Sequence, residues 1–400
     1  MTKVKSTALG PNLLPQPSRL VLIALLIATT YGFLWPAITG DMRDFLIPWL
    51  DTILTRGQIG AFAEPFSNYT PPYLYLLALI SPLSGVLGDI GLVKALSVGG
   101  TLLLVLAVRH LLRVAGCGRN VEMAIWVALL PSVAVNAAGF GQCDAIWSAA
   151  CVMAVASAIS RKPVAMLLWF GVGFAFKAQA IFIAPFIAQR LLSERMPAIL
   201  WPLPGLVYIG AMLPAALAGW PISDLFTIYL RQAEWNPEFI SNAANLWAGV
   251  QYGAPTAGLA WLWLGFVAAA AASVLFLIAF RKLDGSPTPL IGLALLSAML
   301  LPFLLPKMHE RFFFLADVLA LIYAALRRDR LGWSLFLLVE AASAMALMGV
   351  LFRLPLPPAI GGLLMLAAIL ILWRNLQMST EVKSDRPGTG PLPLARLDLA

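Results

Sequence analysis

Long apolar segments follow one another along almost the whole 400-residue chain, and short polar breaks separate them. A helix of about 20 apolar residues crosses a hydrocarbon core of about 30 Å, and most of these segments reach or approach that length. We expect crossing helices at residues 20–39, 90–112, 121–139, 143–160, 163–176, 178–192, 198–218, 256–280, 288–305, 309–327, 331–352 and 357–374. The pattern predicts an all-α, polytopic membrane protein with about twelve transmembrane helices.

Three stretches depart from this regular pattern. The segment 71–88 is hydrophobic enough to span, but its Pro-Pro start, Pro82 and closing Gly and Ser residues favour a helix in the outer interface. Residues 44–54 place apolar side chains on one face, as in a helix lying on the membrane surface. The helices 163–176 and 178–192 are short for full spans and indicate a broken helix that lines a protein cavity.

The composition supports a membrane protein, because 60% of the residues are hydrophobic and only 12% are charged. Soluble domains have about 25% charged residues. We expect one transmembrane domain over residues 1–376, with outer loops at 40–89 and 219–250, and a disordered cytoplasmic tail at 377–400. The three cysteines have neither the spacing of a disulfide framework nor that of a metal site.

The net charge of +8 bears on topology, because Lys and Arg collect in the short cytoplasmic loops of membrane proteins. Basic clusters alternate along the chain with polar loops that contain fewer basic residues. This alternation predicts that both termini are cytoplasmic and that the unusual polar segments share the extracytoplasmic side. No basic cluster belongs to an exposed soluble fold, so we expect no nucleic-acid partner.

Acidic and amide side chains lie next to two of the predicted helix boundaries. Asp41 and Asp44 directly follow the first helix, and Gln142 and Asp144 precede an apolar helix in GFGQCDAIW. A carboxylate at such a position can act as a catalytic group, or it can stabilise the positive end of a helix dipole. The sequence leaves both interpretations open.

Polar residues also occur inside two otherwise apolar regions. Lys177 and Gln179 stand in FKAQ between two short helices, where an ammonium group is costly unless it faces a cavity, a counter-charge or the interface. Asn245 and Trp247 belong to NAANLW in the loop 219–250, which is rich in Trp, Asn and Gln. Such residues suit either sugar recognition or anchoring at the membrane interface.

The densest charge cluster is PKMHERFF, where Lys307, His309 and Arg311 surround Glu310. We expect this segment at the start of an outer-side helix, where backbone N–H groups and basic side chains converge on one anion. In a lipid setting the natural anion is a phosphate carried by a lipid. Ion pairing of Glu310 with its basic neighbours is the alternative.

The collinear set DMRDFLIPW, NYTPPYLYLL, GQCDAIW, FKAQAIFIAP, NAANLW and KMHERFFF resembles the GT-C superfamily of polytopic glycosyltransferases, and within it the bacterial GPI-mannosyltransferase-like proteins. The set spans residues 41–314. FKAQ departs from the family pattern in having Ala178 where a proline is expected, which predicts a softer local break.

The resemblance implies a sugar donor on polyprenyl phosphate, an active site facing away from the cytoplasm, and a catalytic Asp in the first outer loop. Asp41 takes that role, with Asp44 as its rival. The donor phosphate would meet His309 and Arg311, with Lys177 as a further contact and Lys307 nearby. Gln142, Asp144, Gln179, Glu310, Asn245 and Trp247 are the expected substrate contacts.

We therefore expect an integral glycosyltransferase of the bacterial inner membrane that moves a hexose, with mannose the expected sugar, to a lipid-linked glycan or glycolipid acceptor. A carboxylate base and fixed cations suit this chemistry. No cofactor is required by the motifs, although Asp41 and Asp144 could hold a divalent cation. The alternatives are a polysaccharide ligase or polymerase with a lipid-pyrophosphate donor, and a twelve-helix transporter. The transporter hypothesis lacks the expected internal repeat.

Overall fold

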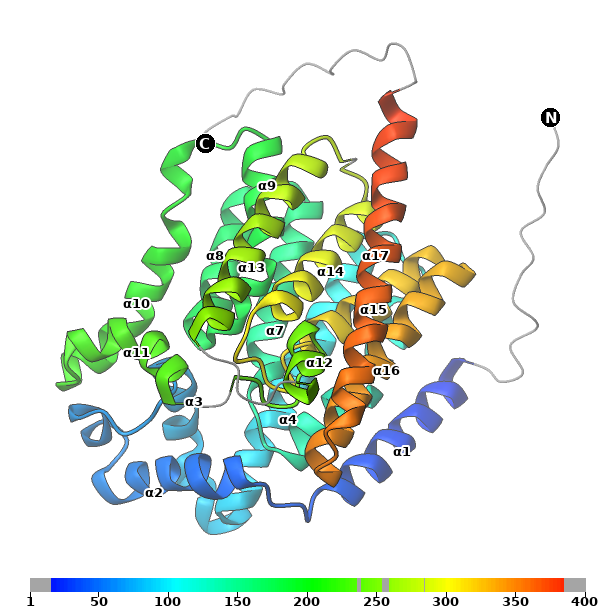
Figure 1. Cartoon of the computed structure of the whole chain (residues 1–400). Coiled ribbons are helices and arrows are strands. Elements are labelled where there is room, and N and C mark those ends of the chain that lie inside the picture. Colours follow the sequence, from blue (N-terminus) through cyan, green and yellow to red (C-terminus); the bar gives the residue numbers. More distant parts are fainter. Residues whose placement is uncertain (1–15, 236–238, 254–258, 284, 385–400) are drawn as a thin grey trace, which may run out of the picture.

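The computed structural model of the chain describes residues 16–235, 239–253, 259–283 and 285–384. These residues are almost entirely helical (Figure 1), and the strand-like contacts among them are isolated bridges of His309 with Ser241 and Asn242. The prediction of an all-α membrane protein is confirmed, because apolar helices make up most of the described chain.

The first half contains α1 Gln16–Leu34, α2 Ile47–Arg56, α3 Pro71–Ile80, α4 Ser84–Val114, α5 Asn120–Trp126, α6 Pro131–Ala134, α7 Asp144–Ile159, α8 Pro163–Phe176 and α9 Ala184–Ser193. The second half contains α10 Leu203–Ala218, α11 Ile222–Trp235, α12 Leu246–Gly253, α13 Leu259–Ala279, α14 Pro287–Leu304, α15 Phe314–Arg327, α16 Arg330–Phe352 and α17 Leu356–Ser384. Short 3₁₀ or π turns precede or follow several of them.

Seven helical stretches in the described residues are long and apolar enough to cross a membrane, or eight if the bent pair Asn120–Leu129 and Pro131–Gly139 counts as one span. Three further apolar helices, Asp144–Ile159, Pro163–Phe176 and Ala178–Ser193, are shorter. The predicted number of twelve crossings is therefore not confirmed. Sequence hydropathy detected the short helices as well, because a helix buried among other helices is as apolar as one that faces lipid.

The positions of the helices in the bundle explain their composition. Helix α14 is central, with 78% of its apolar window buried, whereas the windows of α1, α10 and α13 are at most 17% buried. Exposed leucines and tryptophans cover these outer helices, which present apolar surface to the membrane. The main core joins α4, α7, α14 and α15, and a second core lies beneath α2 and α3.

Breaks in the helices occur close to the positions that the sequence indicated. Lys177 is extended (φ −158°, ψ 137°) between α8 and a 3₁₀ turn, so the predicted broken helix is confirmed. The segment 71–88 forms α3, a 3₁₀ turn and the start of α4, which is kinked at Gly88 (φ 68°). The amphipathic stretch 44–54 forms a π turn followed by α2.

Two local predictions need correction. Helix α15 begins at Phe314, not at residue 309, so the PKMHER segment is a loop that precedes the helix. Helix α17 continues to Ser384, beyond the expected domain end at residue 376, because its polar last turns extend an apolar helix that is already formed. The rest of the predicted tail, residues 385–400, lies outside the described residues.

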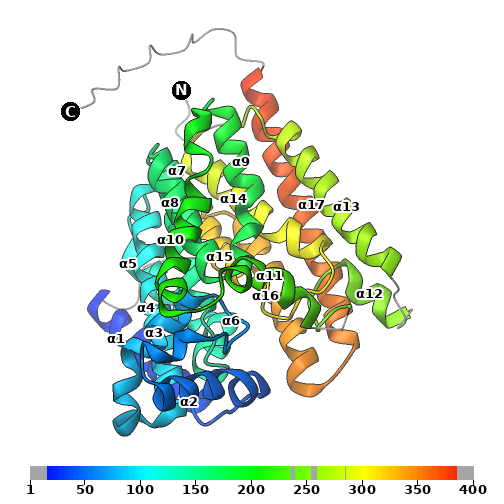
Figure 2. The ribbon, with the colours of Figure 1, turned by 90° about the vertical axis from the view of Figure 1, so that its left-hand side faces the viewer.

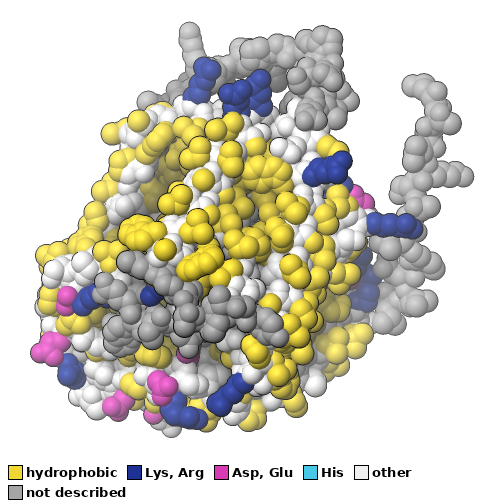
Figure 3. Space-filling view, in the orientation of Figure 1, with side chains coloured by type: hydrophobic (Ala, Val, Ile, Leu, Met, Phe, Trp, Pro, Cys, Tyr) yellow, Lys and Arg dark blue, Asp and Glu magenta, His cyan; other side chains and the backbone are white. Residues whose placement is uncertain are grey.

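The two ends of the bundle differ in their side chains. Helix α2 and the start of α4 lie at one end, and α9 lies at the other (Figure 1; Figure 2 shows the bundle from the side). On the face shown in Figure 3, most visible Asp and Glu side chains lie around α2, whereas Lys and Arg side chains are visible at both ends.

Candidate active site

A buried lysine on α4 fixes the backbone of the segment that leads to Asp41. The Lys94 side chain on α4 is fully buried, and its Nζ donates hydrogen bonds to the carbonyl oxygens of Trp35 (2.5 Å) and Ala37 (2.6 Å). These carbonyls follow the end of α1, where the chain has no helical partners for them. Lys94 therefore fixes the path of the backbone that leads to Asp41.

Asp41 lies at the partly exposed edge of a polar cluster. Its Oδ2 is 2.9 Å from Arg311 Nη2 and accepts a hydrogen bond from Gln142 Nε2 at 3.0 Å. The Tyr69 hydroxyl donates to Gln142 Oε1 at 2.8 Å, which fixes the orientation of the amide. The Asp41 side chain is 38% exposed, so it can meet a substrate while remaining attached to the cluster.

Gly141 permits the close contact on which this arrangement depends. Its φ is +65°, a conformation that glycine adopts readily. A Cβ added there would come within 2.5 Å of the Met42 side chain and 3.1 Å of Val93. Any larger residue would push Met42 away, and Met42 is the neighbour of Asp41.

Asp144 forms the buried centre of the cluster. Its Oδ1 is 2.6 Å from Lys177 Nζ and accepts from Trp147 Nε1 at 2.8 Å, and its Oδ2 accepts from Asn136 Nδ2 at 2.6 Å. The Arg311 Nε lies 3.8 Å from the same Oδ2. A carboxylate that is only 2% exposed is therefore fully paired, as a buried charge must be.

Lys177 reaches Asp144 because the helix breaks at this residue. The hydroxyl of Thr70 donates to the carbonyl oxygen of Phe176 at 3.0 Å, which satisfies the end of α8 where the helix stops. The Lys177 ammonium also lies 5.1 Å from the centre of the Tyr69 ring. The segment 69–70 therefore supports both the lysine and, through Tyr69, the amide of Gln142.

The PKMHER loop is held by short backbone contacts with the segment 239–242. Lys307 N donates to Phe239 O at 2.7 Å, and Ser241 N donates to Met308 O at 2.9 Å. These contacts fix the loop between α14 and α15. They place His309 and Arg311 beside the cluster.

Arg311 connects three carboxylates, since its Nη1 also lies 3.1 Å from Glu310 Oε1. Burial opposes the positive charge of Arg311, but Glu310 and Asp41 raise its pKa above the ordinary value. Burial raises the pKa of Glu310, and Arg311 partly opposes that rise. Burial and the charge of Arg311 lower the pKa of His309 to about 3, so this imidazole is neutral at pH 7.

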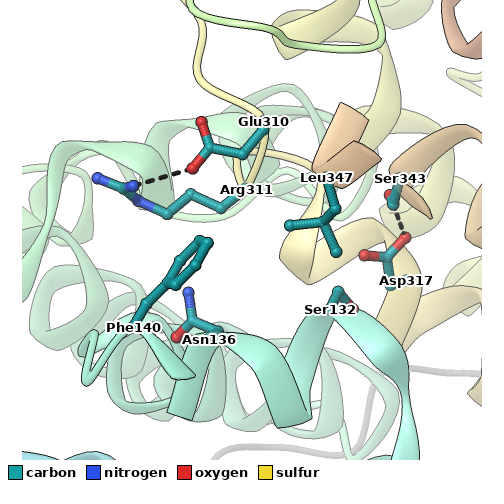
Figure 4. Close-up of a pocket in the computed structure, with 8 residues that line it drawn as sticks. All are labelled: Ser132, Asn136, Phe140, Glu310, Arg311, Asp317, Ser343 and Leu347. Carbon is teal, nitrogen blue, oxygen red and sulfur yellow. Dashed lines mark hydrogen bonds and ion pairs between the residues drawn. The ribbon is translucent and has the colours of Figure 1, made fainter. Parts of the chain in front are cut away.

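A small polar pocket extends from this cluster into the helices (Figure 4). Glu310 and Arg311 lie on one side of it, and Asp317 accepts a 2.7 Å hydrogen bond from Ser343 on the other. The second carboxylate oxygen of Asp317 is buried without a hydrogen-bond partner among the described residues. The pocket volume of about 10 Å³ leaves room for roughly one water molecule, so the pocket is too small for a sugar.

The remaining predicted residues lie outside the ion-pair cluster. Asp44 is exposed and forms no ion pair with another described residue. Gln179 follows Lys177 in the 3₁₀ turn, and its Oε1 is buried without a described hydrogen-bond partner. The buried Asn245 and Trp247 side chains donate to backbone oxygens near the end of α14, with Asn245 Nδ2 3.2 Å from Pro302 O and Trp247 Nε1 2.7 Å from Leu304 O.

Sequence reasoning missed three residues of the cluster, Tyr69, Asn136 and Trp147, and it also missed the supporting Lys94. Tyr69 and Trp147 stand inside motifs that were noticed, NYTPPYLYLL and GQCDAIW. Asn136 precedes Asp144 by eight residues, and a buried amide in an otherwise apolar stretch was the available signal.

The carboxylates considered for a divalent cation bond to protein cations instead. Asp41 pairs with Arg311, and Asp144 pairs with Lys177. Within the described ranges, no group of three or more His, Cys, Asp and Glu side chains has the arrangement of a metal site.

Comparison with known proteins adds a sequence match and a structural match. Residues 50–193 match the model of the MptA_B family, described as Alpha-(1->6)-mannopyranosyltransferase, N-terminal domain. This part of the chain includes Asp144 and Lys177, but neither Asp41 nor Arg311. No curated protein matches the sequence.

Among solved structures, the chain is similar to the crystal structure of ArnT from Cupriavidus metallidurans bound to undecaprenyl phosphate. The TM-score is 0.53 at 13% sequence identity, and the match covers 92% of this chain and 79% of that chain. At this identity the similarity shows a shared fold, and that fold is the GT-C arrangement expected from the motifs. The chain is thus a polytopic membrane protein with the GT-C fold, and its residues 50–193 are similar to a family of mannopyranosyltransferases.

Proposed function

We propose that the protein transfers mannose from a polyprenyl-phosphate-linked donor to a lipid-linked glycan or glycolipid acceptor. The observation that carries this proposal is the pairing of a partly exposed carboxylate, Asp41, with a guanidinium, Arg311, at 2.9 Å. A proton acceptor and a phosphate-binding cation thus lie side by side. The mannopyranosyltransferase match supports mannose as the sugar, and the undecaprenyl phosphate bound to ArnT supports a polyprenyl-phosphate donor.

In the proposed reaction, a hydroxyl of the acceptor attacks the anomeric carbon of the donor sugar. The new bond joins the acceptor oxygen to this carbon, and the bond from the carbon to the phosphate oxygen breaks. The acceptor proton passes to Asp41, and the bonding electrons leave with the polyprenyl phosphate. A positioned base typically contributes about 10²–10⁴-fold to such a step.

Arg311 and His309 are the proposed contacts of the leaving phosphate. Arg311 supplies a charged, bidentate donor, whereas the neutral His309 supplies a single ring N–H. Because the donor phosphate competes with Asp41 for Arg311, we propose that donor binding draws the guanidinium away and leaves Asp41 free to accept a proton. The base then becomes active only after the donor has bound.

Lys177 and Asp144 form the support of this site. The Lys177 side chain is 4% exposed and already paired with Asp144, so we propose that it adds positive potential to the phosphate site from a fixed position. Lys307, in the same loop as Arg311, is proposed to add charge at the outer edge. Its backbone N–H donates to the carbonyl oxygen of Phe239, which fixes the backbone of this loop at Lys307.

The proposed substrate contacts differ in how directly they can act. Gln142 holds Asp41, and Glu310 holds Arg311, so both orient the reacting groups. We propose that Oε1 of Gln179, which is buried without a hydrogen-bond partner among the described residues, accepts a hydroxyl of the sugar. Asn245 and Trp247 position the end of α14, from which the PKMHER loop departs.

We propose that the active site faces the extracytoplasmic side of the bacterial inner membrane, with both termini in the cytoplasm. The positive-inside pattern of the sequence supports this orientation.

The test is an assay of the purified full chain in detergent with polyprenyl-phosphate mannose and extracted membrane glycolipids. We expect a mannosylated lipid product and the release of polyprenyl phosphate. The same assay with polyprenyl-phosphate glucose measures sugar selectivity, and a lipid-pyrophosphate glycan donor tests the ligase alternative. Turnover of the pyrophosphate donor alone would overturn the proposal in favour of the ligase.

A further inference from the structure

A groove lies at the end of the bundle opposite the candidate active site. It is formed where α9 and α13 end, and its volume is about 560 Å³. Helices α7 and α9 lead away from the cluster around Asp144, and α14 leads from this far end back to it. The groove is therefore separated from Asp41 and Arg311 by the length of these helices.

The groove combines an apolar floor with a basic rim. Leu192, Leu277 and Ile278 supply apolar side chains, and the exposed Arg195, Arg281 and Lys282 supply three positive charges. None of these three cations forms an ion pair with a described carboxylate, and no acidic side chain lines the groove. Asp284 lies outside the described residues. The positive charges therefore lack a described counter-charge at a membrane-facing edge.

Two contacts keep the groove in shape. Gln189 on α9 is buried, and its Nε2 donates to the carbonyl oxygen of Phe280 at 2.7 Å, which ties α9 to the end of α13. Glu194, the acidic residue directly after α9, is held by an ion pair with Arg190. This pairing keeps the carboxylate from neutralising the rim.

We propose that the groove binds one anionic phospholipid of the surrounding bilayer. The headgroup phosphate meets Arg195, Arg281 and Lys282, and an acyl chain lies against Leu192, Leu277 and Ile278. Basic pockets between membrane helices favour anionic headgroups because each Lys or Arg near the surface adds attraction. A free phosphate can bind the basic rim, but it has no acyl chain to contact the apolar floor and should therefore bind more weakly than the whole lipid. This site is independent of the proposed sugar transfer.

The test is native mass spectrometry of the full-length protein in a neutral detergent, titrated with dioleoyl phosphatidylglycerol. A groove variant carries Arg195→Gln, Arg281→Gln and Lys282→Gln. The matched control carries Arg109→Gln, Arg161→Gln and Lys162→Gln, which removes three exposed charges from the same end of the bundle but outside the groove. We expect the groove variant to bind the first lipid roughly tenfold more weakly or worse, and the control to change less than twofold.

Three further measurements separate the possible sources of binding. Dioleoyl phosphatidylcholine should bind the wild-type protein much more weakly, and glycerol phosphate alone should not reproduce the lipid affinity. The pair Leu192→Gln and Ile278→Gln should weaken lipid binding while leaving the basic rim intact. An equal loss of phosphatidylglycerol affinity in the groove and control variants would overturn the proposal. Equal affinity of the wild-type protein for glycerol phosphate and for the whole lipid would overturn it too.

Discussion

The guanidinium of Arg311 lies 2.9 Å from the carboxylate of Asp41, so the proposed base and the proposed phosphate ligand are paired with each other. The same guanidinium also contacts Glu310 and approaches Asp144. A donor phosphate that binds Arg311 therefore changes the surroundings of Asp41 directly. Substrate binding and activation of the base are coupled through one side chain.

Asp41→Asn should reduce kcat by 10²-fold or more with little change in donor affinity, because the amide keeps the shape of the side chain but cannot accept the proton. Asp44→Asn is the matched control, since Asp44 is exposed and outside the cluster. Single-turnover transfer and donor-binding measurements check both variants. A larger loss for Asp44→Asn would move the base to that residue.

Arg311→Gln should raise the KM for the donor roughly ten- to a hundredfold, because charge-assisted hydrogen bonds to the phosphate contribute about 1.5–3 kcal/mol. His309→Gln should have a smaller effect, since the neutral imidazole supplies an uncharged hydrogen bond. Arg43→Gln, an exposed arginine in the first loop, is the control. Donor titrations at saturating acceptor give these values. Unchanged donor affinity in Arg311→Gln would remove this residue from the phosphate site.

Lys177→Met should destabilise the protein by about 3–5 kcal/mol, because it leaves the buried Asp144 without its ion-pair partner. Asp144→Asn should also destabilise the protein, because it leaves the buried Lys177 ammonium without a carboxylate partner. The double variant, Lys177→Met with Asp144→Asn, should recover much of the thermal stability. It should recover little activity if the pair positions Arg311 and adds positive potential at the phosphate site. Unfolding in detergent and transfer assays report the two effects separately. Full activity in the double variant would reduce the pair to a structural role.

Lys94→Met should lower kcat roughly tenfold through Asp41, because the backbone before Asp41 loses its two hydrogen bonds from α4. Donor affinity should change little, since Lys94 does not approach Arg311. Ser97→Ala, about one turn further along α4 and also buried, serves as the control. If KM and kcat change equally, Lys94 does not act through the position of the base.

Membrane topology can be tested with single cysteines in a background without Cys117, Cys143 and Cys151, which are all buried. Thr55→Cys on α2 should react with an impermeant thiol reagent applied to intact cells made permeable only at the outer membrane. Gly118→Cys, between α4 and α5 at the other end of the bundle, should react only after lysis. The reverse labelling pattern would place the proposed active site in the cytoplasm.

Several features of the fold follow from local sequence patterns. The apolar segments and their breaks predicted most helices to within a few residues, because a backbone in lipid must satisfy its own hydrogen bonds and a helix does so locally. The break at Lys177 was predicted from the short apolar segments on either side of it, and the amphipathic segment before Arg56 was predicted from its one-sided apolar face. The charge-rich motifs also indicated where the polar cluster would form.

What the sequence by itself determined was therefore which segments are helical and which residues are costly to bury alone. The tertiary structure decided which partner each of those residues has. Asp144 pairs with Lys177, thirty-three positions away, and Asp41 pairs with Arg311, although each could equally have capped a helix. Hydropathy could not distinguish membrane-crossing helices from short buried ones, because both exclude water. Ion pairs between distant residues depend on how the helices pack, and no local pattern records that packing.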